Sequence, residues 1–435
     1  MSRLALLLAF AGLATLPTAT VSAQSDYGSI YSRFALGQRA DGSSSQADAM
    51  GVSGVAIRSG LYNGLSNPAH GADQSLATFS ASGTVRGIRA TDANDTMSEA
   101  TAGGIEFLQF GIPLYANRLG ATLSYRPYSR VNYRAAEEGM VDLDGGDPVE
   151  FRSNLEGNGG LQRISLGLGG KVGEVLTVGA SADALLGTVE YLRRTEFPSA
   201  SDAFLETREA QSTRMYGFTG TVGATATFRR LAAENDGLTL AAAVTLPATL
   251  RGSRATTLGT SLNRDTLSTQ SDGDITLPLL ARAGVAYRAS NRFLASADAV
   301  YEPWSDFESD FPFGGYNPTS STTNATLEDR LRIGGGLEWT PGGGRRGASY
   351  IQQISYRLGA YVEDGFIRAD DQTLLTRALT GGLSLPTRLS NARLDLGFEV
   401  GTRGEASGIL VRDLFWRGTL TLNFGERWFV RRRLG

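Results

Sequence analysis

Cysteine is absent from the 435 residues of this chain, and the single histidine is His70. Without cysteine the chain forms neither disulfide bonds nor thiolate metal sites. Nucleophilic catalysis needs an activated side chain beside a base, and one histidine close to Gly and Pro residues is expected to be a turn residue. We therefore predict that the protein is not an enzyme, carries no cofactor and has no metal site.

Long apolar runs are missing after residue 23. No later stretch approaches the roughly 20 apolar residues that a membrane-spanning helix needs, so a helical membrane protein is excluded. The net charge is -3. A nucleic-acid partner requires a basic surface that displaces counterions from phosphates, and this charge argues against one.

The first residues have the pattern of a secretory signal peptide. Arg3 supplies a positive charge, Leu4 to Leu16 form an apolar run too short to span a bilayer, and Val21-Ser22-Ala23 supplies small residues for cleavage. Residues 1–23 are therefore interpreted as a signal peptide, so that the mature chain starts at Gln24. The alternative is a buried N-terminal helix.

A period of two runs through the rest of the chain. Between residues 176 and 186 the even positions carry Leu, Val and Ala, whereas the odd positions carry mostly Thr, Gly, Ser and Asp. Residues 392–401 alternate in the same way, with charged residues opposite the apolar face. In a transmembrane barrel the apolar set faces lipid and the polar set faces the lumen. A soluble sandwich also alternates, so the number of segments and the connections between them decide.

Fourteen alternating segments follow one another, an even number as bacterial single-chain barrels require. They lie near 77–89, 103–114, 119–133, 159–172, 176–193, 212–229, 238–253, 273–288, 293–303, 325–339, 351–363, 373–385, 392–402 and 411–429. Long polar connections at 90–102, 134–158, 194–211, 254–272, 304–324 and 364–372 alternate with mostly tighter turns. We predict an all-β fold, a closed antiparallel transmembrane β-barrel of 14 strands over residues 76–430, because an open sheet edge is too costly in hydrocarbon.

This barrel is expected in the outer membrane of a Gram-negative cell, surrounded by outer-membrane lipid, with residues 431–435 as a basic periplasmic tail. Fourteen strands enclose a lumen too wide for the wall side chains to fill. Residues 24–75 show little alternation and are interpreted as an N-terminal hatch inside the barrel; the alternative is a disordered periplasmic tail. Charged residues on the inner face are expected to form one structural network. Its members are Asp183, Arg282, Asp298, Arg357, Arg393, Asp395 and Glu399.

Three short motifs lie in the expected hatch. Tyr31 to Gly37 reads YSRFALG, residues 49–54 read AMGVSG, and Asn67-Pro68-Ala69 stands just before the first strand. Together with the strand number, they make the chain resemble the FadL-type (OmpP1/TodX) family of outer-membrane transporters for long-chain fatty acids and aromatic hydrocarbons. In that family an Asn-Pro-Ala motif marks the hatch. The chain's last aromatic residue, Phe429, resembles the strand end that the barrel-insertion machinery binds during biogenesis.

The resemblance implies transport of a hydrophobic small-molecule ligand through a plugged barrel, with lateral release into lipid at a kink in a wall strand. Arg126-Pro127-Tyr128 interrupts the third segment, and a proline within a paired strand removes a ladder hydrogen bond. This tripeptide is the candidate lateral gap, unless Pro127 merely lies at the outer strand end. The alternative function is a porin, or a secretion or surface-assembly component, without transport of a hydrophobic ligand. A hatch argues against a porin, whose lumen stays open.

Overall fold

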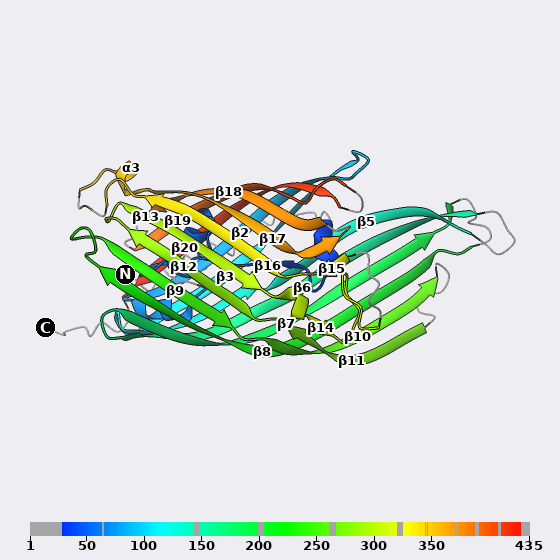
Figure 1. Ribbon diagram of the computed structural model, residues 1–435, viewed down its shortest axis with the longest axis horizontal. Coiled ribbons are helices and arrows are strands. Elements are labelled where there is room, and N and C mark those ends of the chain that lie inside the picture. Colours follow the sequence, from blue (N-terminus) through cyan, green and yellow to red (C-terminus); the bar gives the residue numbers. More distant parts are fainter. Residues whose placement is uncertain are drawn as a thin grey trace, which may run out of the picture.

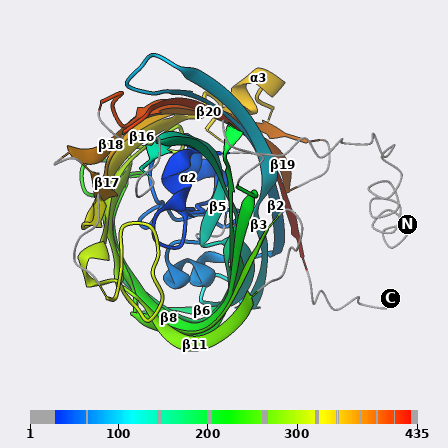
Figure 2. The ribbon, with the colours of Figure 1, turned by 90° about the vertical axis from the view of Figure 1, so that its right-hand side faces the viewer.

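The computed structural model describes residues 28–62, 65–142, 148–198, 204–260, 267–319, 325–343, 345, 347–369, 372–387, 391–407 and 410–427. The predicted signal peptide and the predicted basic tail lie outside these residues. Figure 1 shows strands inclined to the long axis of a barrel, and Figure 2 shows the N-terminal segment inside the ring that they form.

Antiparallel pairing passes around the whole wall and returns to its start, since β2 pairs with β20. The first strands are β2 (Ala77–Thr91), β3 (Met97–Tyr115), β4 (Leu119–Pro127), β5 (Ser129–Val141), β6 (Val149–Val172), β7 (Leu176–Glu196) and β8 (Thr207–Arg229). The next are β9 (Gly237–Thr245), β10 (Ala248–Thr260), β11 (Leu267–Leu277), β12 (Leu280–Arg288), β13 (Phe293–Glu302), β14 (Glu308–Ser309), β15 (Ala325–Leu327) and β16 (Arg330–Trp339). The last are β17 (Ser355–Ala369), β18 (Gln372–Pro386), β19 (Ala392–Arg403) and β20 (Arg412–Glu426).

The pairs β4/β5, β9/β10, β11/β12 and β15/β16 are each one wall strand with an interruption, so that the wall has 14 strands. The predicted fold class is therefore confirmed. Among the described residues, no helix is both long and apolar enough to cross a membrane.

The strands face as the alternation predicts. Asp183 points into the barrel and is 1% exposed, whereas Leu166 and Phe218 on the outer face are 60% and 76% exposed. An outer belt of exposed apolar side chains of this kind is the surface that a membrane barrel presents to lipid.

Several predicted loops were wrong, because the strands continue into them. The 134–158 segment holds the outer halves of β5 and β6, which pair as far as Val141 and Val149. β7 and β8 likewise pair as far as Thr195 and Thr207, and β10 and β11 as far as Leu258 and Leu267. Beyond the bilayer neither sheet face meets lipid, so hydropathy there no longer alternates although the backbone ladder continues.

One strand start was also wrong. The segment predicted at 351–363 begins instead with the short helix α3 (Tyr350–Gln353), and β17 starts at Ser355.

The hatch is built from short elements inside the barrel (Figure 2). These are η1 (Ile30–Arg33), β1 (Gln38–Arg39), α2 (Ser45–Ala49) and η2 (Pro68–Asp73). Ser44 caps α2 by accepting a hydrogen bond from the Ala47 amide. Asn67 caps η2 in the same way through the Ala69 amide, and Pro68 occupies the first turn, where its missing N–H is not needed. The Asn-Pro-Ala motif therefore starts a 3-10 helix.

Wall glycines let the hatch backbone lie directly against the barrel. A Cβ added at Gly359 of β17 would collide with the carbonyl group of Met50, and one at Gly179 of β7 would collide with the Pro68–Ala69 peptide. At these positions the absence of a side chain is required by close backbone approach.

We predict that Gly359→Ala loosens the hatch, because overpacking of this kind costs about 1 to 3 kcal/mol. The heat-modifiable gel migration of the purified barrel should then be lost at a lower temperature. Gly381→Ala on the neighbouring strand is the matched control, since its Cβ would meet only the Arg357 carbonyl oxygen at 3.6 Å. Equal midpoints for both variants would contradict close packing of the hatch at Gly359.

Candidate functional site

A gap in strand pairing lies between β3 and β5. β3 pairs with β4 only as far as Leu108 and Tyr125. Beyond that point the described part of β3 pairs with β2 alone, and β5 pairs with β6 on one side. On its other side β5 pairs with the two hatch residues of β1 and bonds to the hatch again at Asn132, whose carbonyl accepts from the Gly28 amide at 2.9 Å.

The predicted gap residues lie at the point where the wall strand turns inward. Arg126 is 4% exposed and donates hydrogen bonds to the carbonyl oxygens of Asp41 (3.3 Å) and Gly42 (2.6 Å) in the hatch. Pro127 is the last residue of β4 in register with β6. The Tyr128 amide bonds to the Leu161 carbonyl (2.8 Å), and its ring lies 3.7 Å from the Arg39 guanidinium carbon. The kink therefore directs β5 onto the hatch and away from β3.

Glycines on β6 accommodate this inward turn. Gly159 and Gly160 have φ angles of 104° and 133°, which side chains rarely adopt. A Cβ at Gly160 would also collide with the Ser129 carbonyl oxygen at the start of β5. The kink of one strand thus depends on a matching distortion in its neighbour.

Ion pairs of Glu106 span the gap on its inner side. The Glu106 carboxylate on β3 lies 3.2 Å from Arg130 of β5, 3.5 Å from Arg417 of β20 and 3.7 Å from Arg86 of β2. Arg130 also donates to the Ile105 carbonyl oxygen at 3.0 Å. Side chains therefore join β3 and β5 where their backbones do not pair.

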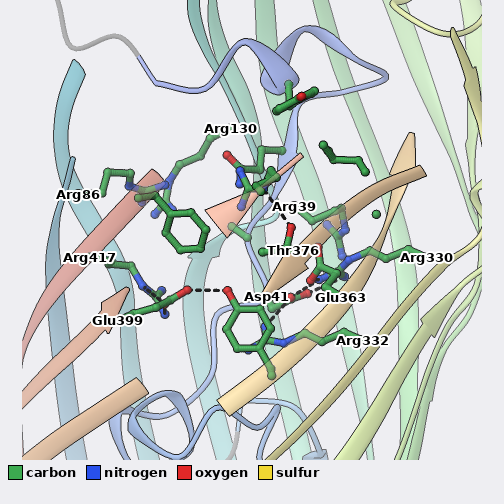
Figure 3. Close-up of a pocket in the computed structure, with 18 of the residues that line it drawn as sticks. Arg39, Asp41, Arg86, Arg130, Arg330, Arg332, Glu363, Thr376, Glu399 and Arg417 are labelled. Carbon is green, nitrogen blue, oxygen red and sulfur yellow. Dashed lines mark hydrogen bonds and ion pairs between the residues drawn. The ribbon is translucent and has the colours of Figure 1, made fainter. Parts of the chain in front are cut away.

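Behind the gap lies a cavity of about 130 Å³ with a strongly charged lining (Figure 3). Besides the ion pairs of Glu106, the lining contains a cluster of charges around Asp41 of the hatch. Asp41 pairs with Arg330 and with Arg332 (3.0 Å) of β16. Arg330 also contacts Glu363 (2.7 Å) and Glu302 (3.1 Å). Glu302 in turn pairs with Arg39 of the hatch at 2.6 Å. Ion pairs between the wall and the hatch therefore surround this cavity, which we call the charged chamber.

The predicted network of seven inner charges is divided into separate clusters. Asp395 and Arg357 are 3.7 Å apart, and Arg357 also contacts Glu338 at 2.8 Å. Asp183 pairs with Arg163 (2.6 Å) and Glu399 with Arg417 (2.6 Å), neither of which the sequence singled out.

The remaining three members, Asp298, Arg393 and Arg282, form no ion pair within the described residues. Asp298 accepts hydrogen bonds from the hatch at Ser53 and Gly54, and Arg393 donates to Ser384 at 2.6 Å. Arg282 is 4% exposed and contacts none of the predicted carboxylates within ion-pair distance. The expectation that Arg282 and Arg393 face Asp183, Asp298, Asp395 and Glu399 as ion-pair partners was wrong, because the hatch and additional wall residues take those carboxylates.

Asp41, Glu106, Arg330 and Arg417 form ion pairs at this site but were not among the site residues predicted from the sequence. Arg330 and Arg417 lie on alternating strands and their inward position was open to prediction from the period of two. Asp41 lies in a segment without periodicity, so no local pattern identified it.

A second cavity opens at the outer end of the barrel, between the hatch tip and β5 to β8. It has a volume of about 410 Å³ and a largely aromatic and aliphatic lining. Phe34, Tyr133, Tyr191 and Phe313 are among its lining residues, and Arg33 and Arg193 lie at its edge. The Tyr191 hydroxyl is buried without a hydrogen-bond partner among the described residues.

A family model described as BamG matches residues 6–435. The chain belongs to the BamG family. No curated protein matches this BamG-family chain in sequence.

Solved structures similar to this BamG-family protein include proteins titled as a monoaromatic hydrocarbon channel and a toluene transporter. They include the CymD monoaromatic hydrocarbon channel, at 15% identity over 90% of this chain and 100% of that chain with a TM-score of 0.56. The toluene transporter TbuX of Ralstonia pickettii has 17% identity over 89% and 99%, with a TM-score of 0.55. A Pseudomonas aeruginosa FadL homologue has 12% identity over 90% and 99%, also with a TM-score of 0.55.

These identities establish the fold alone. They confirm the predicted FadL-type barrel fold. A closed 14-stranded barrel with an apolar outer belt also confirms the predicted location in the outer membrane of a Gram-negative cell.

His70 in η2 gives a pH-dependent test of the hatch. Burial lowers the pKa of His70 from 6.5 to about 4, with Asp73 and Arg58 nearby, and neither ring nitrogen has a hydrogen-bond partner in the described chain. The unfolded chain takes up a proton near pH 6.5, whereas the folded one takes it up only near pH 4. The contribution of neutral His70 to the free energy of unfolding is therefore fully present above pH 6.5 and is lost as the pH falls toward 4.

We predict that His70→Leu removes this part of the pH dependence, which amounts to about 3 kcal/mol at roughly 1.36 kcal/mol for each pKa unit. Unfolding midpoints of wild type and variant should diverge between pH 7 and pH 4, because the wild type alone loses stability through this residue. Superimposable pH profiles would mean that His70 is not held neutral by the folded hatch.

Proposed function

We propose that this chain is a closed outer-membrane barrel that works in outer-membrane biogenesis, as a membrane-embedded component of surface or barrel assembly. Membership of the BamG family supports this context. The observation that carries the proposal is the attachment of the hatch to strands on all sides of the wall.

The attachments come from opposite sides of the barrel. Asp41 pairs with β16, Arg39 with Glu302 of β13, and Asp48 with Arg417 of β20 at 3.5 Å. Hydrogen bonds add further strands: the Asn67 amide donates to the Ala224 carbonyl of β8 at 3.3 Å, and Ser129 of β5 donates to the Leu36 carbonyl at 2.6 Å.

Breaking one buried ion pair by withdrawing a partner costs about 3 to 5 kcal/mol, and displacing this hatch breaks several at once. A small apolar ligand that binds the outer cavity supplies too little free energy to do so. This argues for a barrel that keeps its hatch in place, and against a porin with an open lumen.

The outer end of the barrel offers surface to protein partners. β6, β7 and β8 have 24, 21 and 23 residues, whereas β13 has 10. In Figure 1 the strands β5 to β8, β10 and β11 accordingly reach far beyond the opposite wall. A one-sided extension of paired strands is rigid and is well suited to hold a partner above the membrane.

We predict that loss of this chain lowers the amount of correctly folded outer-membrane barrels, measured as the heat-modifiable fraction of several such proteins in isolated membranes. The full chain should restore that fraction. A chain in which residues 192–210 are replaced by a tight turn should restore it less, because the paired β7–β8 extension is removed while the membrane-spanning part remains. Normal folding of other barrels without this chain would contradict the proposal.

A second function is favoured by the β3–β5 gap together with the outer apolar cavity: passage of a hydrophobic small molecule from that cavity through the gap into lipid. The similar structures, titled as monoaromatic hydrocarbon channel and toluene transporter, support it at the level of fold. The charged chamber behind the gap argues that such a molecule carries a polar head.

For this second function we predict that Pro127→Ala, which adds a backbone N–H at the kink, lowers uptake of a fluorescent fatty acid by whole cells. Barrel stability should stay equal or rise. Pro278→Ala is the matched control, since Pro278 also interrupts a wall strand but lies between β11 and β12, away from the gap. Uptake that is the same in wild type and both variants would eliminate the route at this strand.

A further inference from the structure

Three arginines from different strands line one small cavity under the hatch. Arg126 of β4, Arg163 of β6 and Arg282 of β12 are 4%, 3% and 4% exposed. The hatch covers them with residues that include Ser66 and Pro68. Arginine keeps its proton at any ordinary pH, so three positive charges meet in this place.

Too few carboxylates face these charges. Asp183 pairs with Arg163 at 2.6 Å and is also bound by Thr221 at 2.8 Å. Arg126 donates only to hatch carbonyl oxygens, and no carboxylate of the described residues lies within ion-pair distance of Arg126 or Arg282. The Arg163 Nε is buried without a partner there as well. Two positive charges therefore lack a counter-charge in a region of low dielectric, which costs several kcal/mol for each ion.

The remaining lining of the cavity supplies hydrogen-bond donors and no carboxylate. These residues include Gln109, Thr122, Ser124, Ser165 and Ser181. The Ser181 hydroxyl donates to Asp183 at 3.2 Å, and Ser165 also hydrogen-bonds Asp183. The groups that can donate to a bound anion are therefore the guanidinium groups, the Gln109 amide and the Thr122 and Ser124 hydroxyls.

The size of the cavity selects the kind of anion. Its volume of about 20 Å³ exceeds only slightly the roughly 10 to 15 Å³ that one water molecule needs in the same measure. A single monatomic ion fits this volume, and so small a volume favours it over phosphate or the head of a lipid.

We propose that this cavity binds a halide ion, chloride under native conditions, between Arg126, Arg163 and Arg282. The ion neutralises the excess charge where the arginine side chains of β4, β6 and β12 line the same cavity. Because Arg126 also holds the Asp41–Gly42 carbonyls, the bound ion stabilises the hatch in its place. This site is independent of the proposed function.

The test compares the purified full chain in sodium gluconate and in sodium chloride at equal ionic strength. The midpoint of heat-modifiable gel migration should rise by a few degrees with chloride and reach saturation, as binding to the folded state alone requires. Arg282→Gln should abolish the chloride-dependent rise. Arg393→Gln should keep it, because Arg393 is an inner arginine that bonds to Ser384 and does not line the cavity.

Equal midpoints in chloride and gluconate for the wild type would overturn the proposal, as would a full chloride response of Arg282→Gln. If Arg282→Gln does not assemble, anomalous diffraction from wild-type crystals grown in bromide decides instead. A bromide peak among the three arginines supports the site, and water density alone at that position overturns it.

Discussion

Pairing of buried charges between hatch and wall is the interaction on which this structure depends. A 14-stranded wall turns alternate side chains inward, and many of those here are charged. In a lumen shielded from water such charges need partners. Asp41 meets Arg330 and Arg332, and Arg39 meets Glu302, so the hatch supplies counter-charges that the wall lacks. The barrel and its hatch are therefore one unit, and removing the hatch takes from Arg332 the one carboxylate that it pairs with among the described residues.

The alternation of the sequence was enough to predict the fold and the direction in which wall residues point. A period of two fixes the face of every strand residue once one is known, and Asp183, Asp395 and Glu399, on the face that the alternation assigns to the lumen, are buried in the structure. Pairing between side chains is different, because it depends on register around the barrel and on the course of the hatch. Arg393 is bonded to Ser384, and Asp298 accepts its hydrogen bonds from hatch residues, neither of which a strand pattern contains.

At the kink Arg126-Pro127-Tyr128, too, one part follows from the local sequence and another part depends on long-range contacts. The sequence directs attention to this tripeptide because proline is rare in a paired strand, and in the structure β4 ends at Pro127 and β5 starts at Ser129. The destination of the kinked strand, against β1 and away from β3, follows from long-range contacts such as Arg126 to the Gly42 carbonyl. A FadL-type barrel thus keeps a side opening in its ladder and fills the space behind it with ion pairs.

The measurement that tests this account most directly is the ionic conductance of the purified full chain in a planar lipid bilayer. If buried ion pairs hold the hatch in the lumen, the chain inserts without sustained conductance over a wide range of applied voltage. A mutant without residues 40–57, which include Asp41 and Asp48, should conduct. Large, sustained conductance by the unaltered chain would contradict the account, because the lumen would then be open with the hatch present.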